Sequence, residues 1–267
     1  MDRLDAEFEQ ASEEGRKSFI AYVCAGDPDP ETSLEICRVL LKSGVDILEL
    51  GVPFSDPLAD GWTNQCAAKR ALDSGTTKAD VLQLVRSLRQ IDGETPIVFY
   101  AYYNQIFSQG AESYLKEAYS AGVDAVLALD LPPVEAKNYL EICREVGMKT
   151  VFIVAPTTPE DRIAEIAEAS TGFVYYVSRE GVTGVREDLE KGIGSMVESI
   201  KSKTAKPDVV GFGISWKEQV REGAPVAVGV VVGSPILNLV PHHQDNRPQL
   251  LLRLKELVGD LSSGVRS

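Results

Sequence analysis

Histidine and cysteine are scarce in this chain of 267 residues. The two histidines, His242 and His243, follow the last apolar segment in what reads as a polar turn, which argues against a histidine acid, base or metal ligand inside the fold. The four cysteines are Cys24, Cys37, Cys66 and Cys143. They form no Cys-x-x-Cys pair and have no histidine nearby in the sequence, so we expect free, buried thiols and no metal site.

The chain also has fewer basic than acidic residues. The chain has 27 Lys and Arg against 40 Asp and Glu, a formal net charge of −13, and this excess of acid argues against a nucleic-acid partner. No apolar run reaches the roughly 18 residues of a membrane helix. The acidic start, MDRLDAEFEQASEEG, lacks the apolar core of a signal peptide. We therefore expect a cytoplasmic protein with no membrane contact.

A short apolar run followed by a turn and a segment of helical period recurs eight times along the chain. The runs cover residues 19–23, 46–50, 97–101, 125–129, 150–154, 173–177, 209–212 and 228–232. The helical patterns cover residues 31–42, 65–72, 79–89, 111–121, 134–146, 159–169, 188–201, 216–222 and 247–261. Continuously apolar strands are typical of parallel sheets covered on both faces. The pattern predicts an α/β fold, a closed (β/α)8 TIM barrel with extra short helices, with a doubly wound open sheet as the alternative.

No linker or change of composition divides the chain, so we expect residues 1–267 to form one domain. Residues 1–17 are expected to hold an N-terminal helix. Two connections are longer than the rest, at 52–64 after the second strand and at 178–187 after the sixth. In a barrel both lie at the C-terminal ends of the strands, where barrel enzymes carry their chemistry.

Carboxylates are the main candidates for that chemistry, because Lys149 precedes its strand and so lies at the wrong end for a Schiff base. Acidic residues near the C-terminal ends of predicted strands are Asp27, Glu49, Asp56, Asp60, Asp130 and Glu180. Glu49 lies in the apolar run DILELG, where alternation with Leu48 and Leu50 directs it into the barrel. Burial raises the pKa of a carboxyl group and favours acid–base chemistry. A structural glutamate bonded to neighbouring strands is the alternative.

Asp60 lies near the end of the loop PFSDPLADG, which Pro53 and Pro57 stiffen. Aspartate in such loops commonly caps a turn, so a capping role and a functional role for Asp60 both stay open on this pattern alone.

Glycine and serine follow the last two strands, in GFGIS at 211–215 and in VVVGSP at 230–235. Ser234 is expected at the N-cap of a short helix and Pro235 at its first position. Barrels commonly bind phosphate on backbone amides of the loops after strands seven and eight. The two turns together favour a phosphorylated ligand.

Six segments, in order along the chain, resemble the α subunit of tryptophan synthase. They are AGDPDPETSL at 25–34, DILELGVPFSDPLADG at 46–61, DLPP at 130–133, GFVYYVSREGVTGVRE at 172–187, GFGIS at 211–215 and VVVGS at 230–234. The resemblance implies retro-aldol cleavage of indole-3-glycerol phosphate to indole and glyceraldehyde 3-phosphate, in tryptophan biosynthesis, without a metal or an organic cofactor in this chain. It assigns the catalytic pair to Glu49 and Asp60.

The resemblance also assigns binding roles. The indole pocket is expected to be lined by Tyr22, Tyr100, Leu127, Tyr175 and Phe212. Phosphate is expected on the backbone amides of Gly184, Gly213, Gly233 and Ser234. Residues 178–190 are expected to form a mobile lid over the site, with Thr183 bonding to Asp60 on closure.

A pyridoxal-phosphate-dependent β subunit is the expected partner, in an α2β2 complex. The interface is expected at Pro53, Asp56, Leu58, Asn104 and Pro132. Trp62 stands where the family usually has proline. Two alternatives stay open, a stand-alone indole-glycerol-phosphate lyase and a weakly active allosteric partner of a β subunit. A different phosphate-binding barrel, such as a phosphosugar isomerase, calls for a catalytic lysine, histidine or different carboxylate at other strand ends, and the chain lacks them in suitable places.

Overall fold

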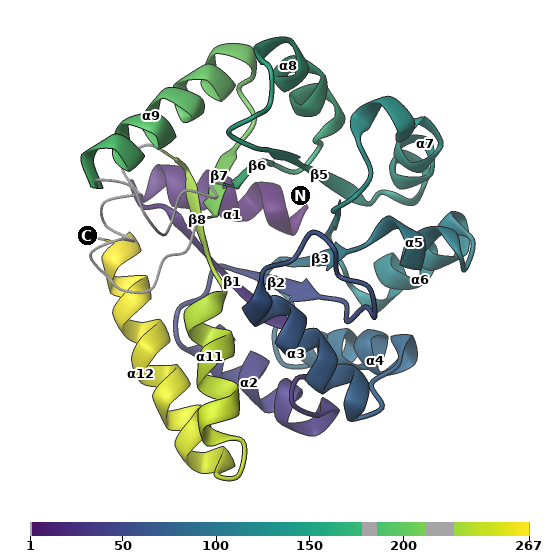
Figure 1. Cartoon of the computed structure of the whole chain (residues 1–267), viewed down its shortest axis with the longest axis vertical. Coiled ribbons are helices and arrows are strands. Elements are labelled where there is room, and N and C mark those ends of the chain that lie inside the picture. The colour runs from purple at the N-terminus through teal and green to yellow at the C-terminus, as the bar shows by residue number, and fades with distance from the viewer. Residues whose placement is uncertain (1, 178–185, 212–226, 267) are drawn as a thin grey trace.

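A closed barrel of eight parallel strands forms the centre of the computed structural model, which describes residues 2–177, 186–211 and 227–266 (Figure 1). The strands are β1 Ser18–Cys24, β2 Ile47–Gly51, β3 Ile97–Ala101, β4 Ala125–Ala128, β5 Lys149–Val154, β6 Val174–Val177, β7 Asp208–Gly211 and β8 Gly229–Val232. Each strand pairs in parallel with its two neighbours in sequence, and β8 pairs with β1. The predicted (β/α)8 barrel is confirmed, and the open-sheet alternative is excluded.

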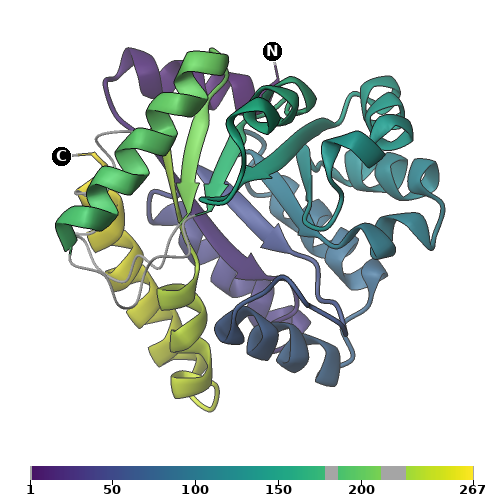
Figure 2. The same ribbon diagram turned by 45° about the horizontal axis from the view of Figure 1, so that its top comes forward.

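Helices surround the barrel (Figures 1 and 2). They are α1 Arg3–Glu13, α2 Pro30–Lys42, α3 Trp62–Asp73, α4 Lys78–Arg89, α5 Tyr103–Phe107, α6 Ala111–Ala121, the 3-10 helix η1 Pro133–Glu135, α7 Lys137–Val146, α8 Glu160–Ala169, α9 Arg186–Lys203, α11 Ser234–His243 and α12 Arg247–Val265. Glycine ends two of them, because Gly122 and Gly147 have φ of 112° and 84°, a left-handed conformation that closes a helix at little cost for glycine. Among the described residues, no helix combines the length and apolar character needed to cross a bilayer.

Several predicted boundaries are corrected. Helix α3 begins at Trp62, three residues before the predicted start, and the predicted helix 134–146 divides into η1 and α7. Helix α11 begins at Ser234 with Gly233 as its N-cap, so Ser234 is the first helical residue instead of the N-cap. His242 and His243 lie in the last turn of that helix and not in a free turn. The predicted helix 216–222 and the predicted strand end Phe212 lie outside the described residues.

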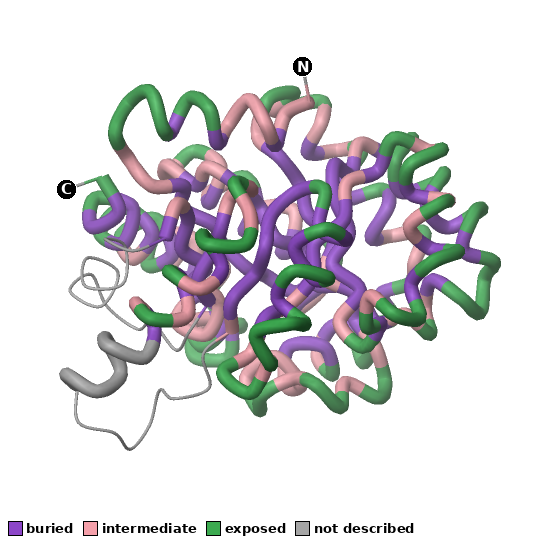
Figure 3. The backbone as a smooth tube through the Cα atoms, turned by 90° about the horizontal axis from the view of Figure 1, so that it is seen from above, coloured by how far each residue is buried: buried purple, intermediate pink, exposed green. Residues whose placement is uncertain are grey.

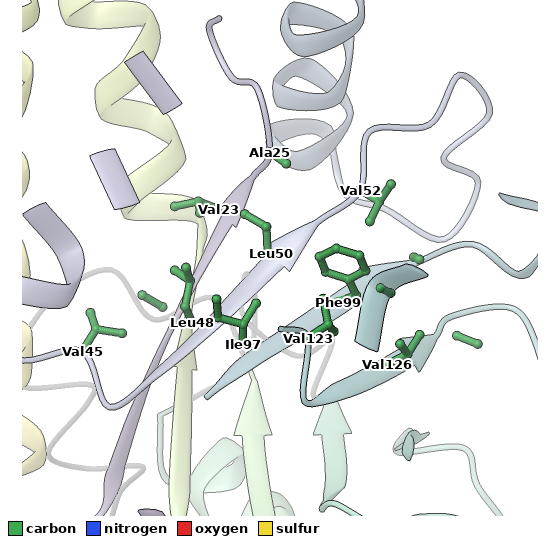
Figure 4. Packing of buried hydrophobic residues seen from close by; sticks show 14 of the residues in the cluster. Val23, Ala25, Val45, Leu48, Leu50, Val52, Ile97, Phe99, Val123 and Val126 are labelled. Carbon is green, nitrogen blue, oxygen red and sulfur yellow. The ribbon is translucent and has the colours of Figure 1, made fainter. Parts of the chain in front are cut away.

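The strands separate two layers of core through the simple alternation of their side chains. Along β2, Leu48 and Leu50 point outward and pack with Ile97 and Phe99 of β3 beneath the helices (Figure 4). Ile47 belongs to the inner cluster, which also contains Val98 and other inward-pointing residues of the strands. The strands are buried nearly throughout, whereas the helices alternate buried and exposed residues (Figure 3). Glu49 therefore follows the inward alternation that the sequence predicts.

Helix α1 closes the N-terminal end of the barrel. Leu4 and Phe8 join the inner cluster, and the rings of Phe8 and Phe173 lie 5.9 Å apart. Ion pairs hold the helix in place, with Arg3 Nη1 at 2.8 Å from Asp124 Oδ1. The closed end leaves the opposite, C-terminal ends of the strands as the place where a ligand can reach the interior.

The four cysteines are free thiols, as predicted. Three are buried and Cys66 is half-buried.

Candidate active site

Glu49 occupies the middle of β2 and is 1% exposed. It lies in register with Tyr22 of β1 on one side and Val98 of β3 on the other. Its Oε1 atom has no hydrogen-bond partner among the described residues. In the described part of the chain, no hydrogen bond of Glu49 makes it a purely structural bridge between strands.

Burial raises the pKa of Glu49 to about 8, and the nearby negative charge of Asp60 adds to the effect. Water cannot solvate the charged form inside the barrel, so the neutral acid is favoured. At neutral pH the side chain therefore holds a proton that it can donate to a bound molecule.

Asp60 lies in the loop between β2 and α3 and accepts three side-chain hydrogen bonds. Tyr100 Oη donates to Oδ1 at 2.7 Å, and Asn64 Nδ2 donates to the same oxygen at 3.0 Å. Tyr102 Oη donates to Oδ2 at 2.9 Å. These donors fix the orientation of the Asp60 carboxyl group. The two acids therefore differ, since Glu49 is desolvated and Asp60 is surrounded by donors.

The loop that carries Asp60 is held at both ends. Gln65 Nε2 donates to the backbone oxygen of Asp60 at 2.9 Å, from the first turn of α3. Gln105 Nε2 donates to the backbone oxygen of Pro53 at 2.9 Å, from α5. The ring of Phe54 packs against that of Tyr102 with centroids 5.1 Å apart. These contacts fix the position of Asp60 relative to β3.

Aromatic side chains line the barrel interior beside Glu49. The rings of Tyr22 and Tyr100 meet edge to face with centroids 5.0 Å apart, and Leu127 lies in register with Tyr100 on β4. Tyr175 of β6 belongs to the same inner cluster. Burial raises the pKa of Tyr22, Tyr100 and Tyr175 well above the ordinary value of 10.0, so all three hydroxyl groups are neutral. The structure brings together these four predicted pocket residues.

Small residues make room for these rings. A Cβ atom on Gly51 would lie 2.4 Å from Tyr22 Oη, and one on Gly211 would lie 2.3 Å from Tyr175 Oη. A Cβ atom on Gly233 would lie 3.0 Å from the ring of Tyr22. The glycines at the ends of β2 and β7 and after β8 thus allow the aromatic side chains to reach over the strands.

Two of the four predicted phosphate-binding residues can be placed. Gly233 and Ser234 follow β8 and begin α11, a helix of ten residues. The first amides of a helix have no acceptor within the helix and can bind an anion. Thr183, Gly184, Phe212 and Gly213, together with most of the predicted lid, lie outside the described residues.

The predicted partner-binding positions lie in the loops after β2, β3 and β4. Asp56, Asn104 and Pro132 are exposed, Leu58 is 92% exposed, and Pro53 is buried. Three further apolar side chains in the same loops and adjoining helices protrude into solvent: Trp62 at 79%, Phe107 at 67% and Val134 at 60% exposed. These are, with Leu58, the four most exposed large hydrophobic residues of the described chain.

Three residues around Asp60 were missed in the sequence: Asn64, Gln65 and Tyr102. Two signals could have indicated them. Tyr100 and Tyr102 are two positions apart, which places them on one side of an extended strand. Asn64 is four residues after Asp60, one helical turn further on.

Other clefts lie away from the carboxyl pair. One of about 670 Å³ lies between α7 and α8, and two of about 590 and 730 Å³ adjoin α1 at the closed end of the barrel. In the described part of the chain, no three acidic, histidine or cysteine side chains gather as a metal-binding group. The carboxyl pair in the barrel is the best-supported site for chemistry.

A parallel (β/α)8 barrel with a buried acid inside it and a hydrogen-bonded carboxyl group in a loop at its open end is the architecture of a barrel enzyme of the acid–base class. The sequence model of the family described as "Tryptophan synthase alpha chain" matches residues 8–266. A protein of that name from Opitutus terrae is 53% identical over 266 residues and covers 100% of both chains. Another from Geotalea daltonii is 41% identical over 99% of both.

Solved structures of the same family are also similar to this chain. The crystal structure of tryptophan synthase subunit alpha from Legionella pneumophila aligns with a TM-score of 0.92 at 32% identity, covering 99% of this chain and 98% of that one. Tryptophan synthase from M. tuberculosis aligns with a TM-score of 0.89 at 32% identity, covering 100% and 99%. This chain belongs to the tryptophan synthase alpha chain family. Its activity is that of a carbon–carbon lyase that cleaves indole-3-glycerol phosphate, and its partner is the tryptophan synthase β subunit.

Proposed function

We propose that Glu49 and Asp60 are the groups that cleave indole-3-glycerol phosphate in this chain. The observation that supports this most directly is the buried Glu49, whose pKa of about 8 keeps it protonated beside a carboxylate. An acid whose pKa lies near the working pH is the most effective proton carrier.

Glu49 transfers two protons in this mechanism. It first donates its proton to C3 of the indole ring, which leaves a positive charge on the ring. It then removes a proton from the hydroxyl of the carbon attached to C3, so that this carbon becomes an aldehyde. The electrons of the broken C–C bond return to the ring and restore neutral indole. The products are indole and glyceraldehyde 3-phosphate, and Glu49 regains its proton.

Asp60 stabilises the charged intermediate. Its carboxylate accepts a hydrogen bond from the indole N–H, whose positive charge grows when C3 is protonated. A fixed group of opposite charge in a water-poor site lowers the barrier of such a step, which raises its rate roughly 10²- to 10³-fold.

The remaining predicted residues bind the substrate. The indole ring lies among Tyr22, Tyr100, Leu127 and Tyr175, with Phe212 as a further wall. The phosphate is held by the amides of Gly184, Gly213, Gly233 and Ser234, and Thr183 belongs to the lid that closes over the bound substrate. The α11 N-terminus supports the phosphate assignment for Gly233 and Ser234.

No organic cofactor is needed in this chain, because acid–base chemistry on the substrate accounts for the cleavage. Pyridoxal phosphate belongs to the β subunit, with which the chain forms an α2β2 complex. The exposed side chains Leu58, Asp56, Asn104 and Pro132 form the contact surface, together with the exposed Trp62. Pro53 is buried in the isolated chain and helps to hold the loop, because its backbone oxygen accepts a hydrogen bond from Gln105. A role in amino-acid biosynthesis also favours the cytoplasm as the location.

The test is a direct assay of indole release with the wild type and Glu49→Gln, each with and without the β subunit. Glu49→Gln is expected to abolish cleavage while the fold and substrate binding persist, because glutamine keeps the shape but carries no transferable proton. Glu141→Gln, on the exposed face of α7, is the matched control and is expected to match the wild type. Near-normal release by Glu49→Gln refutes the acid–base role.

The same assay distinguishes the alternatives for the wild type. A family member that needs its partner is accelerated by the β subunit. A stand-alone lyase is equally fast without it, and a chain whose main effect is allosteric stays slow in both conditions.

A further inference from the structure

The two oxygens of Asp60 are bonded unequally. Oδ1 accepts from Tyr100 Oη at 2.7 Å and from Asn64 Nδ2 at 3.0 Å, whereas Oδ2 accepts only from Tyr102 Oη at 2.9 Å among the described residues. A carboxylate offers about four acceptor sites, two on each oxygen. The described donors therefore fill Oδ1 and leave one acceptor site on Oδ2.

The directions of the two tyrosine hydroxyls follow from their other contacts. Tyr102 Oη accepts the backbone N–H of Ala59 at 2.9 Å, so its single proton is free to point at Asp60 Oδ2. Tyr100 Oη donates to Oδ1 at 2.7 Å, and burial raises the pKa of Tyr100, so its hydroxyl keeps the proton that it donates. Both bonds are charge-assisted and short, which makes them strongly orienting.

Packing of its ring and pairing of its strand fix the position of the Tyr100 hydroxyl. Its ring projects inward from β3, in the inner cluster, and meets the ring of Tyr22 edge to face at 5.0 Å. The ladder bonds of β3 to β2 and β4 hold its backbone, with Gly51 and Leu127 as its neighbours in register. Asn64 is held independently, in the first turns of α3. Asp60 is thus oriented from the barrel wall by Tyr100 and from a surrounding helix by Asn64.

We propose that Tyr100 and Asn64 are positioning residues, which saturate Oδ1 of Asp60 and so present Oδ2 to the indole N–H. This inference rests on the proposed role of Asp60. Tyr100 consequently does more than provide a wall of the indole pocket, because it decides which oxygen the substrate meets. An Asp60 free to rotate would present a correctly placed oxygen for only part of the time, and orientation of this kind is a large part of catalysis.

The experiment is a double-mutant cycle assayed for indole release in the presence of the β subunit. The variants are Tyr100→Phe, Asn64→Ala, Asp60→Asn and the doubles Tyr100→Phe/Asp60→Asn and Asn64→Ala/Asp60→Asn. Tyr139→Phe is the matched control. It removes a buried tyrosine bond, from Tyr139 Oη to the Val126 oxygen at 3.2 Å, on the outer side of the barrel. Thermal unfolding of each variant is recorded to compare folding.

Tyr100→Phe is expected to lower kcat about tenfold, with KM within about twofold of the wild type, because the lost orientation matters most in the charged intermediate. Asn64→Ala is expected to act in the same direction. In the Asp60→Asn background neither change lowers kcat further, since the group that they position has lost its charge. Tyr139→Phe leaves kcat unchanged.

Two results overturn the inference. One is full activity of Tyr100→Phe and Asn64→Ala, and the other is an equal loss in both backgrounds, which indicates a general structural effect. Failure of the proposed function gives a different result, because Asp60→Asn alone then keeps its activity.

Discussion

Asp27 and Arg70 form a two-bonded ion pair between the loop after β1 and helix α3. Arg70 Nε donates to Asp27 Oδ1 and Nη2 donates to Oδ2, both at 2.7 Å. Asp27 is 2% exposed. The pair ties the C-terminal end of β1 to the helix that begins two residues after Asp60, so the loop that carries Asp60 is anchored to the barrel beyond its own contacts.

Removal of the arginine is expected to destabilise the fold. Burial raises the pKa of Asp27, and Arg70 opposes that increase. Arg70→Met leaves a buried carboxyl group without its partner, so the free energy of unfolding is expected to fall by about 2 to 4 kcal/mol. Urea unfolding at pH 7 measures the change.

A neighbouring lysine provides the control. Lys69→Met breaks an exposed pair with Asp73 on the same helix, and its effect is expected to stay below about 0.5 kcal/mol. The double variant Asp27→Asn/Arg70→Met is expected to recover part of the loss. Equal stability of Arg70→Met and Lys69→Met contradicts the anchoring role.

The stability of the wild type is expected to depend on Glu49 between pH 5 and 8. The folded protein holds this proton up to about pH 8, whereas an ordinary glutamate releases it near 4.5. Between these values the unfolded chain binds fewer protons, so unfolding becomes more favourable as the pH rises. Glu49→Gln stays neutral and is expected to gain roughly 3 to 5 kcal/mol relative to the wild type by pH 8.

Thermal and urea unfolding of both proteins at pH 5, 6.5 and 8 measure this gain. Glu112→Gln on the exposed surface of α6 is the control and is expected to show no gain over the same range. A constant difference between Glu49→Gln and the wild type at all three values rules out the raised pKa.

Binding of the β subunit is expected to depend on the protruding apolar residues of the loops after β2. Trp62→Ser and Leu58→Ser each remove a side chain that is mostly exposed in the isolated chain and that the proposed complex would cover. Each is expected to weaken binding about tenfold or more, since large apolar residues at the centre of an interface dominate its affinity.

Calorimetric titration with the β subunit measures these affinities. Leu252→Ser on α12 is the matched control, because Leu252 is 50% exposed but lies on the last helix. The affinity of this variant for the β subunit is expected to equal that of the wild type. An unchanged affinity of both loop variants excludes this surface as the interface.

Much of the barrel could be predicted from the sequence because the strands are apolar and parallel. The run Ile97–Ala101 is bounded by Pro96 and a polar segment, and its predicted and observed limits coincide. The inward direction of Glu49 followed from alternation along DILELG. Helix α5 could not be predicted, because its five residues are too few to show a helical period. The contacts of Gln105 with Tyr102 N and with Pro53 O stabilise it instead.

The surroundings of Asp60 could be predicted only in part. The loop and the aspartate stand out in the sequence, but the donors lie in β3, just after β3 and in α3, up to 42 residues away. The pair of Asp27 with Arg70 joins residues 43 apart. Such contacts depend on how the loop folds back over the barrel, and no local pattern encodes that path.

The position of α1 at the closed end of the barrel has a consequence for synthesis. This helix is made before every strand of the barrel, yet Arg3 and Asp5 bond to Asp124 and Lys149, which are 121 and 144 residues later, and Phe8 packs against Phe173. While the ribosome is still making β6, Leu4 and Phe8 have no complete surface to cover. The nascent barrel therefore keeps its earliest apolar side chains exposed until about two thirds of its length has emerged, and this is the stage at which protection from aggregation matters most.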